Sequence, residues 1–177
     1  MAQIWLISDT HFGHANMYGF LREDGTRVRR EFASAREGDE YMLQKWAEMV
    51  KPEDHIYHLG DVALSRMCLE RVKGLPGHKR LVLGNHDRES LGAYQAVGFQ
   101  KIFGSRNCER LLLSHYPLHP GSIGKAMANV HGHIHYHDSP PGRYINVSVE
   151  RIGYQPVPIE DVIEQAKRLK EQHDTQD

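Results

Sequence analysis

Leu83-Gly84-Asn85-His86-Asp87 continues the apolar run Leu81-Val82-Leu83, a pattern typical of a buried strand that ends in a turn. The same arrangement recurs along the chain, where a short apolar run leads into a side chain that can bind a metal ion or carry a proton. These side chains stand at Asp9, Asp61, Asn85 and His115, and at the pair His133 and His135. The repetition predicts one site assembled from five strand ends.

The first half of the chain alternates between strand and helix patterns. Strands are expected at residues 3–7, 55–59 and 79–83, and helices at 39–50, 62–73 and 90–97. Strand and helix segments of these lengths indicate parallel pairing with right-handed crossovers. Since parallel sheets bind ligands beyond the carboxyl ends of their strands, Asp9, Asp61 and Asn85 should lie at one edge.

The second half consists of shorter apolar segments separated by turns. Strands are expected at residues 98–102, 109–114, 128–132 and 143–149, with one helical turn within 121–126. These segments predict a second, more mixed sheet. Apolar residues at 159, 162, 163, 166 and 169 predict a helix that covers a sheet face, and the tail from 170 to 177 is expected to fray.

Two pairs of candidate ligands are each separated by a single residue. Asp9 and His11 form one pair, and His133 and His135 form the other. Side chains two residues apart in an extended backbone point the same way. If the strands continue through these positions, both members of each pair face one site.

Length and composition limit the possible classes of protein. A chain of 177 residues suits a single domain, taken here as residues 1–177. The 22 lysines and arginines nearly balance the 23 aspartates and glutamates, so no net field attracts nucleic acid or a membrane. Cys68 and Cys108 form no metal or redox motif, and no leader segment or membrane-spanning run is evident. We expect a cytoplasmic protein.

The strand ends supply seven candidate metal ligands. They are Asp9, His11, Asp61, Asn85, His115, His133 and His135. This set is too large for one tetrahedral ion and suits two ions that share a carboxylate. Imidazole and carboxylate ligands without a thiolate favour manganese, iron, cobalt, nickel or zinc over calcium or magnesium. Two such ions would leave the site net positive, so it would attract an anion such as a phosphate ester.

In chain order the motifs are Asp9-x-His11, Gly60-Asp61, Gly84-Asn85-His86-Asp87, His115 and Gly132-His133-x-His135. Together they resemble the calcineurin-like metallophosphoesterases, and the resemblance extends from Asp9 to His135. The longer strings at residues 8–14 and 57–62 resemble a small, uncharacterised bacterial and phage branch of that superfamily. The resemblance implies an α/β fold, a four-layer α-β-β-α sandwich in which helices flank two mixed β-sheets and the metal site lies at the C-terminal strand ends.

The resemblance also implies a role for each motif residue. The first ion would be held by Asp9, His11 and His135, the second by Asn85, His115 and His133, and Asp61 would bridge them. His86 matches the proton donor of the family, and Asp87 would orient the His86 imidazole. The implied cofactors are two divalent transition-metal ions, of which manganese is the first expectation.

The polar segment from residue 19 to residue 36 predicts a long loop, and long loops in compact domains are often functional. Its cluster of arginines forms either a solvated face or a phosphate-binding surface. Arg30 is the preferred phosphate contact, because Arg30-Glu31-Phe32 resembles the Arg-x-Phe of the same branch. His14 and Asn16 either contact substrate or only hold the loop in place.

The expected function is hydrolysis of a phosphomonoester or phosphodiester, in which a metal-bridging hydroxide attacks phosphorus in line and His86 protonates the departing oxygen. Two alternatives remain open, a catalytically silent metal scaffold that binds a partner protein and a nucleic-acid-binding or processing module. An intact proton donor argues against the first, and the balanced charge argues against the second. The substrate could be a small molecule, a nucleotide or a nucleic-acid end, and the sequence defines neither the substrate nor the oligomeric state.

Overall fold

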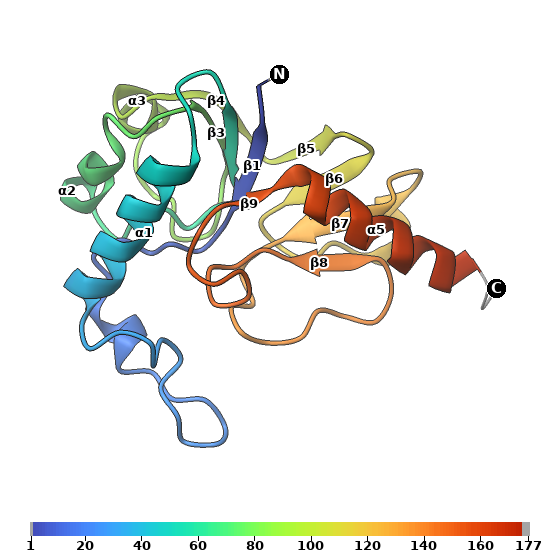
Figure 1. Ribbon diagram of the computed structural model, residues 1–177, viewed down its shortest axis with the longest axis horizontal. Helices are drawn as coiled ribbons and strands as arrows, with labels where there is room; N and C mark the ends of the chain where they lie inside the picture. The colour runs from blue at the N-terminus through green and yellow to red at the C-terminus, as the bar shows by residue number, and fades with distance from the viewer. Residues whose placement is uncertain (1, 175–177) are drawn as a thin grey trace.

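The computed structural model describes residues 2–174 and arranges them around two β-sheets (Figure 1). The strands are β1 (Ile4–Ile7), β2 (His55–His58), β3 (His78–Val82), β4 (Phe99–Phe103), β5 (Ser105–Cys108), β6 (Leu111–Ser114), β7 (Ala128–His131), β8 (Tyr144–Asn146) and β9 (Val157–Pro158). The α-helices are α1 (Ala35–Met49), α2 (Arg66–Leu69), α3 (Leu91–Ala96), α4 (Pro120–Ile123) and α5 (Ile159–Asp174), and the 3-10 turns are η1 (Ala15–Tyr18) and η2 (Glu70–Val72).

Each sheet combines parallel and antiparallel pairs. The first has the strand order β4-β3-β2-β1-β9 and is parallel except for β9 at its edge. The second has the order β5-β6-β7-β8 and is parallel except for β5. The prediction of two mixed sheets is therefore confirmed, and the carboxyl ends of β1, β2 and β3 lie at one edge of the first sheet.

Buried apolar side chains join the layers. Trp46 of α1 packs with Ile56 on the outer face of the first sheet. Leu6 on its inner face packs with Leu113 of the second sheet in a separate cluster. Helix α5 contributes Val162 to this inner cluster and contacts β1, β7, β8 and β9. Helices thus flank the two sheets, and α5 crosses in front of β6, β7 and β8 in the view of Figure 1, with apolar side chains in the inner cluster.

Several predicted segments differ from the structure. Residues 98–102 were expected in the second sheet, but β4 pairs in parallel with β3 because α3 makes one more crossover before the chain leaves the first sheet. Strands β5 and β9 are not predicted, since β5 is polar and mostly exposed and β9 has two residues. The helical pattern at residues 62–73 gives only α2 and η2.

Helix α5 is the last element of the described part of the chain. Helix α5 continues to Asp174, beyond residue 170, where fraying was expected to begin. Residues 175–177 lie outside the described part of the chain. No helix within residues 2–174 is long and apolar enough to cross a membrane.

Residues 19–30, here called the arm, project from the body of the molecule as a turn-rich loop (Figure 1). An antiparallel bridge pairs Leu21 with Arg27, and the Arg22 N–H donates to the Thr26 carbonyl at 2.7 Å. The Val28 N–H donates to the Phe20 carbonyl at 2.8 Å. The predicted long loop therefore exists, and its own hydrogen bonds shape it.

Candidate metal centre

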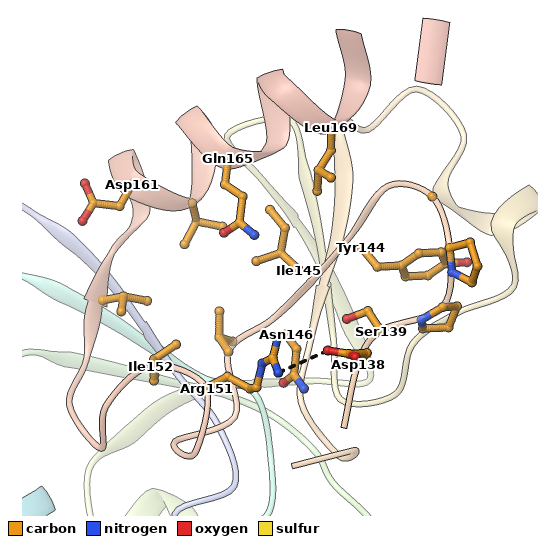
Figure 2. A pocket seen from close by; sticks show the side chains of 16 residues that line it. Asp138, Ser139, Tyr144, Ile145, Asn146, Arg151, Ile152, Asp161, Gln165 and Leu169 are labelled. Atoms are coloured by element: carbon orange, nitrogen blue, oxygen red, sulfur yellow. Dashed lines mark ion pairs between the residues drawn. The ribbon is translucent and has the colours of Figure 1, made fainter. Parts of the chain in front are cut away.

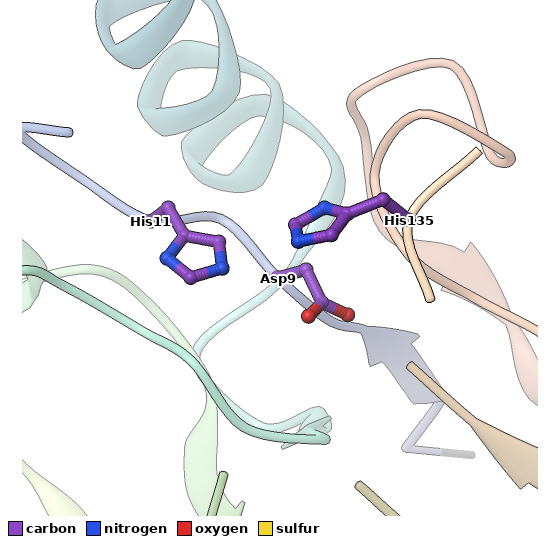
Figure 3. A group of neighbouring side chains, drawn as sticks. All are labelled: Asp9, His11 and His135. Carbon is purple, nitrogen blue, oxygen red and sulfur yellow. The ribbon is translucent and has the colours of Figure 1, made fainter. Parts of the chain in front are cut away.

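The structure brings six of the predicted ligands into two neighbouring groups. Asp9, His11 and His135 form the first group, and Asp61, His115 and His133 form the second. Within each group the possible ligand atoms lie within 4.8 Å of one another. Figure 3 shows the side chains of the first group directed toward a common space from the loops that follow β1 and β7.

Asp61 connects the two groups. Its Oδ2 lies 3.4 Å from His11 Nε2 and 3.4 Å from His115 Nε2. Although burial opposes ionisation, the contact with His115 and the charges of both histidines hold the pKa of Asp61 well below its usual value. Asn85 lies beside the second group, with Oδ1 3.0 Å from His115 Nε2. A carboxylate between two sets of imidazoles is the arrangement expected of a shared ligand.

Five of these residues have a left-handed backbone. The φ angle is 59° at Asp9, 48° at His11, 58° at Asp61, 69° at His133 and 51° at His135. Non-glycine residues rarely adopt this conformation, which costs about 1–3 kcal/mol at each position and clusters at functional sites. The extended backbone assumed from the sequence is therefore wrong at both pairs, because β1 and β7 end before the ligands begin.

The consequence differs between the two pairs. Asp9 and His11 remain in one group, whereas His133 and His135 point into different groups. Hydrogen bonds to the next loop hold the first pair, since the Asp9 N–H donates to the Gly60 carbonyl and the His11 N–H to the Asp61 carbonyl, both at 3.0 Å. Hydrogen bonds between loops thus determine the backbone conformation at Asp9 and His11, which the alternation of side chains along a strand does not explain.

Close backbone approach explains two motif glycines. A Cβ atom at Gly132 would collide with Ser8 and with the Asp9 carboxylate. A Cβ atom at Gly84 would collide with the carboxylate and backbone of Asp61. Both glycines lie at a non-positive φ, so their role is to leave space rather than to permit an unusual turn.

Further hydrogen bonds fix Asp9. The His133 N–H donates to both Asp9 oxygens, at 3.1 and 2.9 Å, and Ser148 Oγ lies 3.0 Å from Asp9 Oδ2. Asn146 Oδ1 lies 2.7 Å from the same serine oxygen, and its Nδ2 donates to the His135 carbonyl at 2.8 Å. Nothing in the sequence points to Asn146, at the end of β8, or to Ser148 after it, because neither stands in a motif.

A buried ion pair supports the first group. Glu150 accepts from Arg29 Nε at 2.8 Å and lies 3.2 Å from His135 Nδ1. The same guanidinium donates to the Asp9 carbonyl at 2.7 Å and to the Thr10 carbonyl at 3.0 Å. Burial raises the pKa of Glu150, but Arg29 and His135 outweigh it and hold the value at about 2. In the sequence, Arg29 is only one of the clustered arginines between residues 19 and 36, and no pattern points to Glu150.

The chemistry of the first group fits a metal ion. Both ring nitrogens of His11 are buried and make no hydrogen bond to the described residues. An unsatisfied buried polar atom costs about 1–3 kcal/mol. Coordination through one of these nitrogens would remove that cost, and imidazoles with carboxylates suit a divalent transition metal.

His86 lies at the centre, and the neighbouring Asp87 bonds to backbone groups of two loops. The His86 ring lies 5.3 Å from the His11 ring, and the backbone N–H of His86 donates to Asp61 Oδ1 at 2.8 Å. Asp87 Oδ2 accepts from the N–H groups of Asp61 and Gly84, both at 2.8 Å, and its Oδ1 accepts from the Val62 N–H at 3.0 Å. These bonds show that Asp87 joins the loops after β2 and β3, and its role in orienting the His86 imidazole stays a prediction.

The predicted substrate contacts lie in different surroundings. The His14 ring lies 5.5 Å from the His11 ring, while Asn16 is exposed on η1. Arg30 is 60% exposed on the arm and lies 3.7 Å from a Glu31 carboxylate oxygen. Arg88, which was not predicted, donates to the Asn85 carbonyl at 3.4 Å and lines a small hollow with His86.

A larger cavity of about 480 Å³ lies between α5, β8 and residues 138–142 (Figure 2). Arg151 and Asp138 form an ion pair of 3.3 Å at its wall. None of its lining residues is a candidate metal ligand, so it is separate from the metal centre. Two lining residues also bond to the loop that carries His135, since Asn146 donates to the His135 carbonyl and Arg151 to the Tyr136 carbonyl.

The fold is a sandwich of two mixed sheets, and two adjacent groups of imidazole and carboxylate ligands lie at its strand ends. These features define a metal-binding α/β protein. The chain belongs to the calcineurin-like phosphoesterase superfamily, whose domain profile matches residues 2–147. Glu150 lies outside the matched residues, whereas all seven predicted ligands lie inside them.

The names of the similar proteins state no activity. An uncharacterized protein, MJ1445, of Methanocaldococcus jannaschii is 28% identical over 183 residues, which cover 96% of this chain and 94% of that protein. The Gene 66 protein of Mycobacterium phage D29 is 38% identical over 93 residues, or 50% of this chain and 42% of the phage protein. The crystal structure of AQ665, a protein of unknown function from Aquifex aeolicus, has a TM-score of 0.70 and 27% identity and covers 93% of this chain and 100% of that one. These relatives agree with the expected uncharacterised branch.

Proposed function

We propose that the protein is a metal-dependent phosphoric ester hydrolase that uses two divalent transition-metal ions on a phosphomonoester or phosphodiester. The observation that carries this proposal is the position of the Asp61 carboxylate, whose Oδ2 lies 3.4 Å from both His11 Nε2 and His115 Nε2. One oxygen thus stands between a nitrogen of each ligand group, as a shared ligand requires.

Asp9, His11 and His135 would hold the first ion, and Asn85, His115 and His133 the second, with Asp61 between them. When bound, such ions lower the pKa of a coordinated water and stabilise the charge that develops on a phosphoryl group. Two divalent ions would bring four positive charges, which the carboxylates of Asp9 and Asp61 only partly neutralise. The centre therefore favours an anionic substrate.

We assign proton donation to the leaving oxygen to His86. Its side chain is half-buried at the metal centre, and the bond from its backbone N–H to Asp61 Oδ1 holds the loop that carries it next to the shared ligand. An imidazole can donate a proton near neutral pH, where most other side chains cannot. A purely structural metal site has no need of this group, which favours an enzyme over a silent scaffold.

The test is hydrolysis of a panel of phosphomonoesters, phosphodiesters and nucleotides by protein loaded with manganese. Manganese is the first choice because it accepts both imidazole and carboxylate ligands. Chelation should abolish activity, and manganese should restore it. The proposal would be refuted if the protein were fully active when elemental analysis finds no metal in it. If both metal sites are filled and no substrate is hydrolysed, the result favours a catalytically silent metal scaffold.

A further inference from the structure

Exposed apolar side chains surround the metal centre. Of the six large apolar side chains with high exposure in the described part of the chain, three lie beside a histidine of the site. They are Phe20 at 48% exposure, Leu64 at 49% and Tyr116 at 45%. Each of the three lies next to a polar side chain of the candidate centre, so an organic group bound there would meet apolar surface.

Tyr116 is the best placed of the three. Its ring centroid lies 4.4 Å from that of His133 and 5.0 Å from that of His115. Its carbonyl accepts from Ser114 Oγ at 2.6 Å, which anchors the backbone at this position. The ring is therefore held against two ligands of the second group while nearly half of the residue faces solvent.

The other two side chains border the remaining sides. Phe20 of the arm contacts His14 edge-on, with ring centroids 6.0 Å apart, and His14 adjoins His11. Leu64 lines the small hollow that also contains His86 and Arg88. The organic part of a substrate whose phosphoryl group lies at the metal centre would therefore contact these apolar side chains. Among them, the aromatic ring of Tyr116 packs most closely against the candidate ligands.

We propose that the organic part of the substrate contains a planar aromatic ring, such as a nucleobase, and that this ring stacks on Tyr116. The inference rests on the proposed function, which it deepens by naming the substrate class. Stacking accepts any flat π-face, so it does not require hydrogen bonds to particular ring atoms. The phosphate would be held by the charged centre and the ring by Tyr116.

The experiment compares two ligands that share a ribose phosphate and differ only in the base, adenosine 5′-monophosphate and ribose 5-phosphate. Calorimetric titration of the manganese-loaded protein measures both dissociation constants without requiring turnover. The base should tighten binding about 5- to 150-fold, the range of a base stacked on an aromatic side chain. Phenyl phosphate in a parallel titration shows whether a single aryl ring is sufficient.

Three variants test the role of the ring. Tyr116→Ala should remove the preference for the nucleotide and leave the affinity for ribose 5-phosphate unchanged, whereas Tyr116→Phe should retain the preference. Leu91→Ala, at a residue 55% exposed on a helix without candidate ligands, should also retain it. Metal content, measured in each variant, should stay at two ions, which separates stacking from support of the ligands.

Three results would overturn the inference. The wild-type protein could bind both ligands with equal affinity, it could bind neither, or the preference for the nucleotide could persist in Tyr116→Ala. A separate result would overturn the proposed function alone. In that case the protein with both metal sites filled would still prefer the nucleotide but would hydrolyse no phosphoester.

Discussion

Replacement of Glu150 by glutamine should weaken the first metal site and spare the second. The Glu150 carboxylate meets Arg29 Nε at 2.8 Å and His135 Nδ1 at 3.2 Å, so it favours the tautomer with a proton on Nδ1 and leaves Nε2 free for an ion. A glutamine cannot serve both partners. With its oxygen toward Arg29, its amide N–H faces Nδ1 and favours the tautomer that carries a proton on Nε2.

The structure sets the size of the effect. Loss of a group that orients a metal-binding histidine typically weakens metal binding by about 10- to 100-fold. The side chains of Arg29 and Glu150 are both 0% exposed, and removal of one partner from a buried ion pair costs about 3–5 kcal/mol. At this chain length the expected fall in Tm is about 6–20 °C.

Calorimetric titration with manganese, together with thermal unfolding, measures both effects. Glu164→Gln provides the control, because it makes the same chemical change in an exposed pair with Lys167 on α5. The double variant Arg29→Met, Glu150→Met removes both buried charges and should recover stability without recovering the first site. Unchanged affinity for both ions, or equal loss at both sites, would refute the reasoning.

Three further changes test the assigned roles. Asp61→Asn should lose both ions while His115→Ala weakens chiefly the second, and elemental analysis that finds two ions in the Asp61 variant would exclude a shared ligand. His86→Ala should slow hydrolysis of an alkyl phosphate ester by about 10²- to 10⁴-fold and that of a nitrophenyl ester much less, because only the departing alkoxide needs a proton. Equal losses of rate on the two esters would exclude proton donation by His86. If Arg30 binds phosphate, Arg30→Ala should raise KM more than it lowers kcat. Arg88→Ala is the comparison. Unchanged kinetic constants in the Arg30 variant would assign Arg30 to the solvated surface.

The sequence alone determined the order of the strand ends and the chemical type of the ligands. Short apolar runs ending at Asp9, Asp61 and Asn85 predicted parallel strands, and parallel strands bring their carboxyl ends to one edge whatever the details of their loops. The two mixed sheets and the superfamily follow from the same patterns. The ligands could be found because each adjoins a strand with a clear local signal.

Only the tertiary structure decided how these side chains are held. The left-handed backbone at Asp9 and His11 depends on hydrogen bonds to the loop that contains Gly60 and Asp61, which the local sequence does not specify. The distribution of His133 and His135 between the two groups depends on a turn rather than on strand alternation. The fold also brings three backbone N–H groups to the carboxylate of Asp87, which joins two loops that are separate in the sequence.

Arg29 and Glu150 show the physical reason most clearly. They are 121 residues apart, and neither stands in a pattern that predicts a buried partner. Burial of each charge is favourable only when the fold brings the other to within hydrogen-bonding distance. A local pattern can therefore identify which residues bind a metal, but long-range packing determines which residues position them.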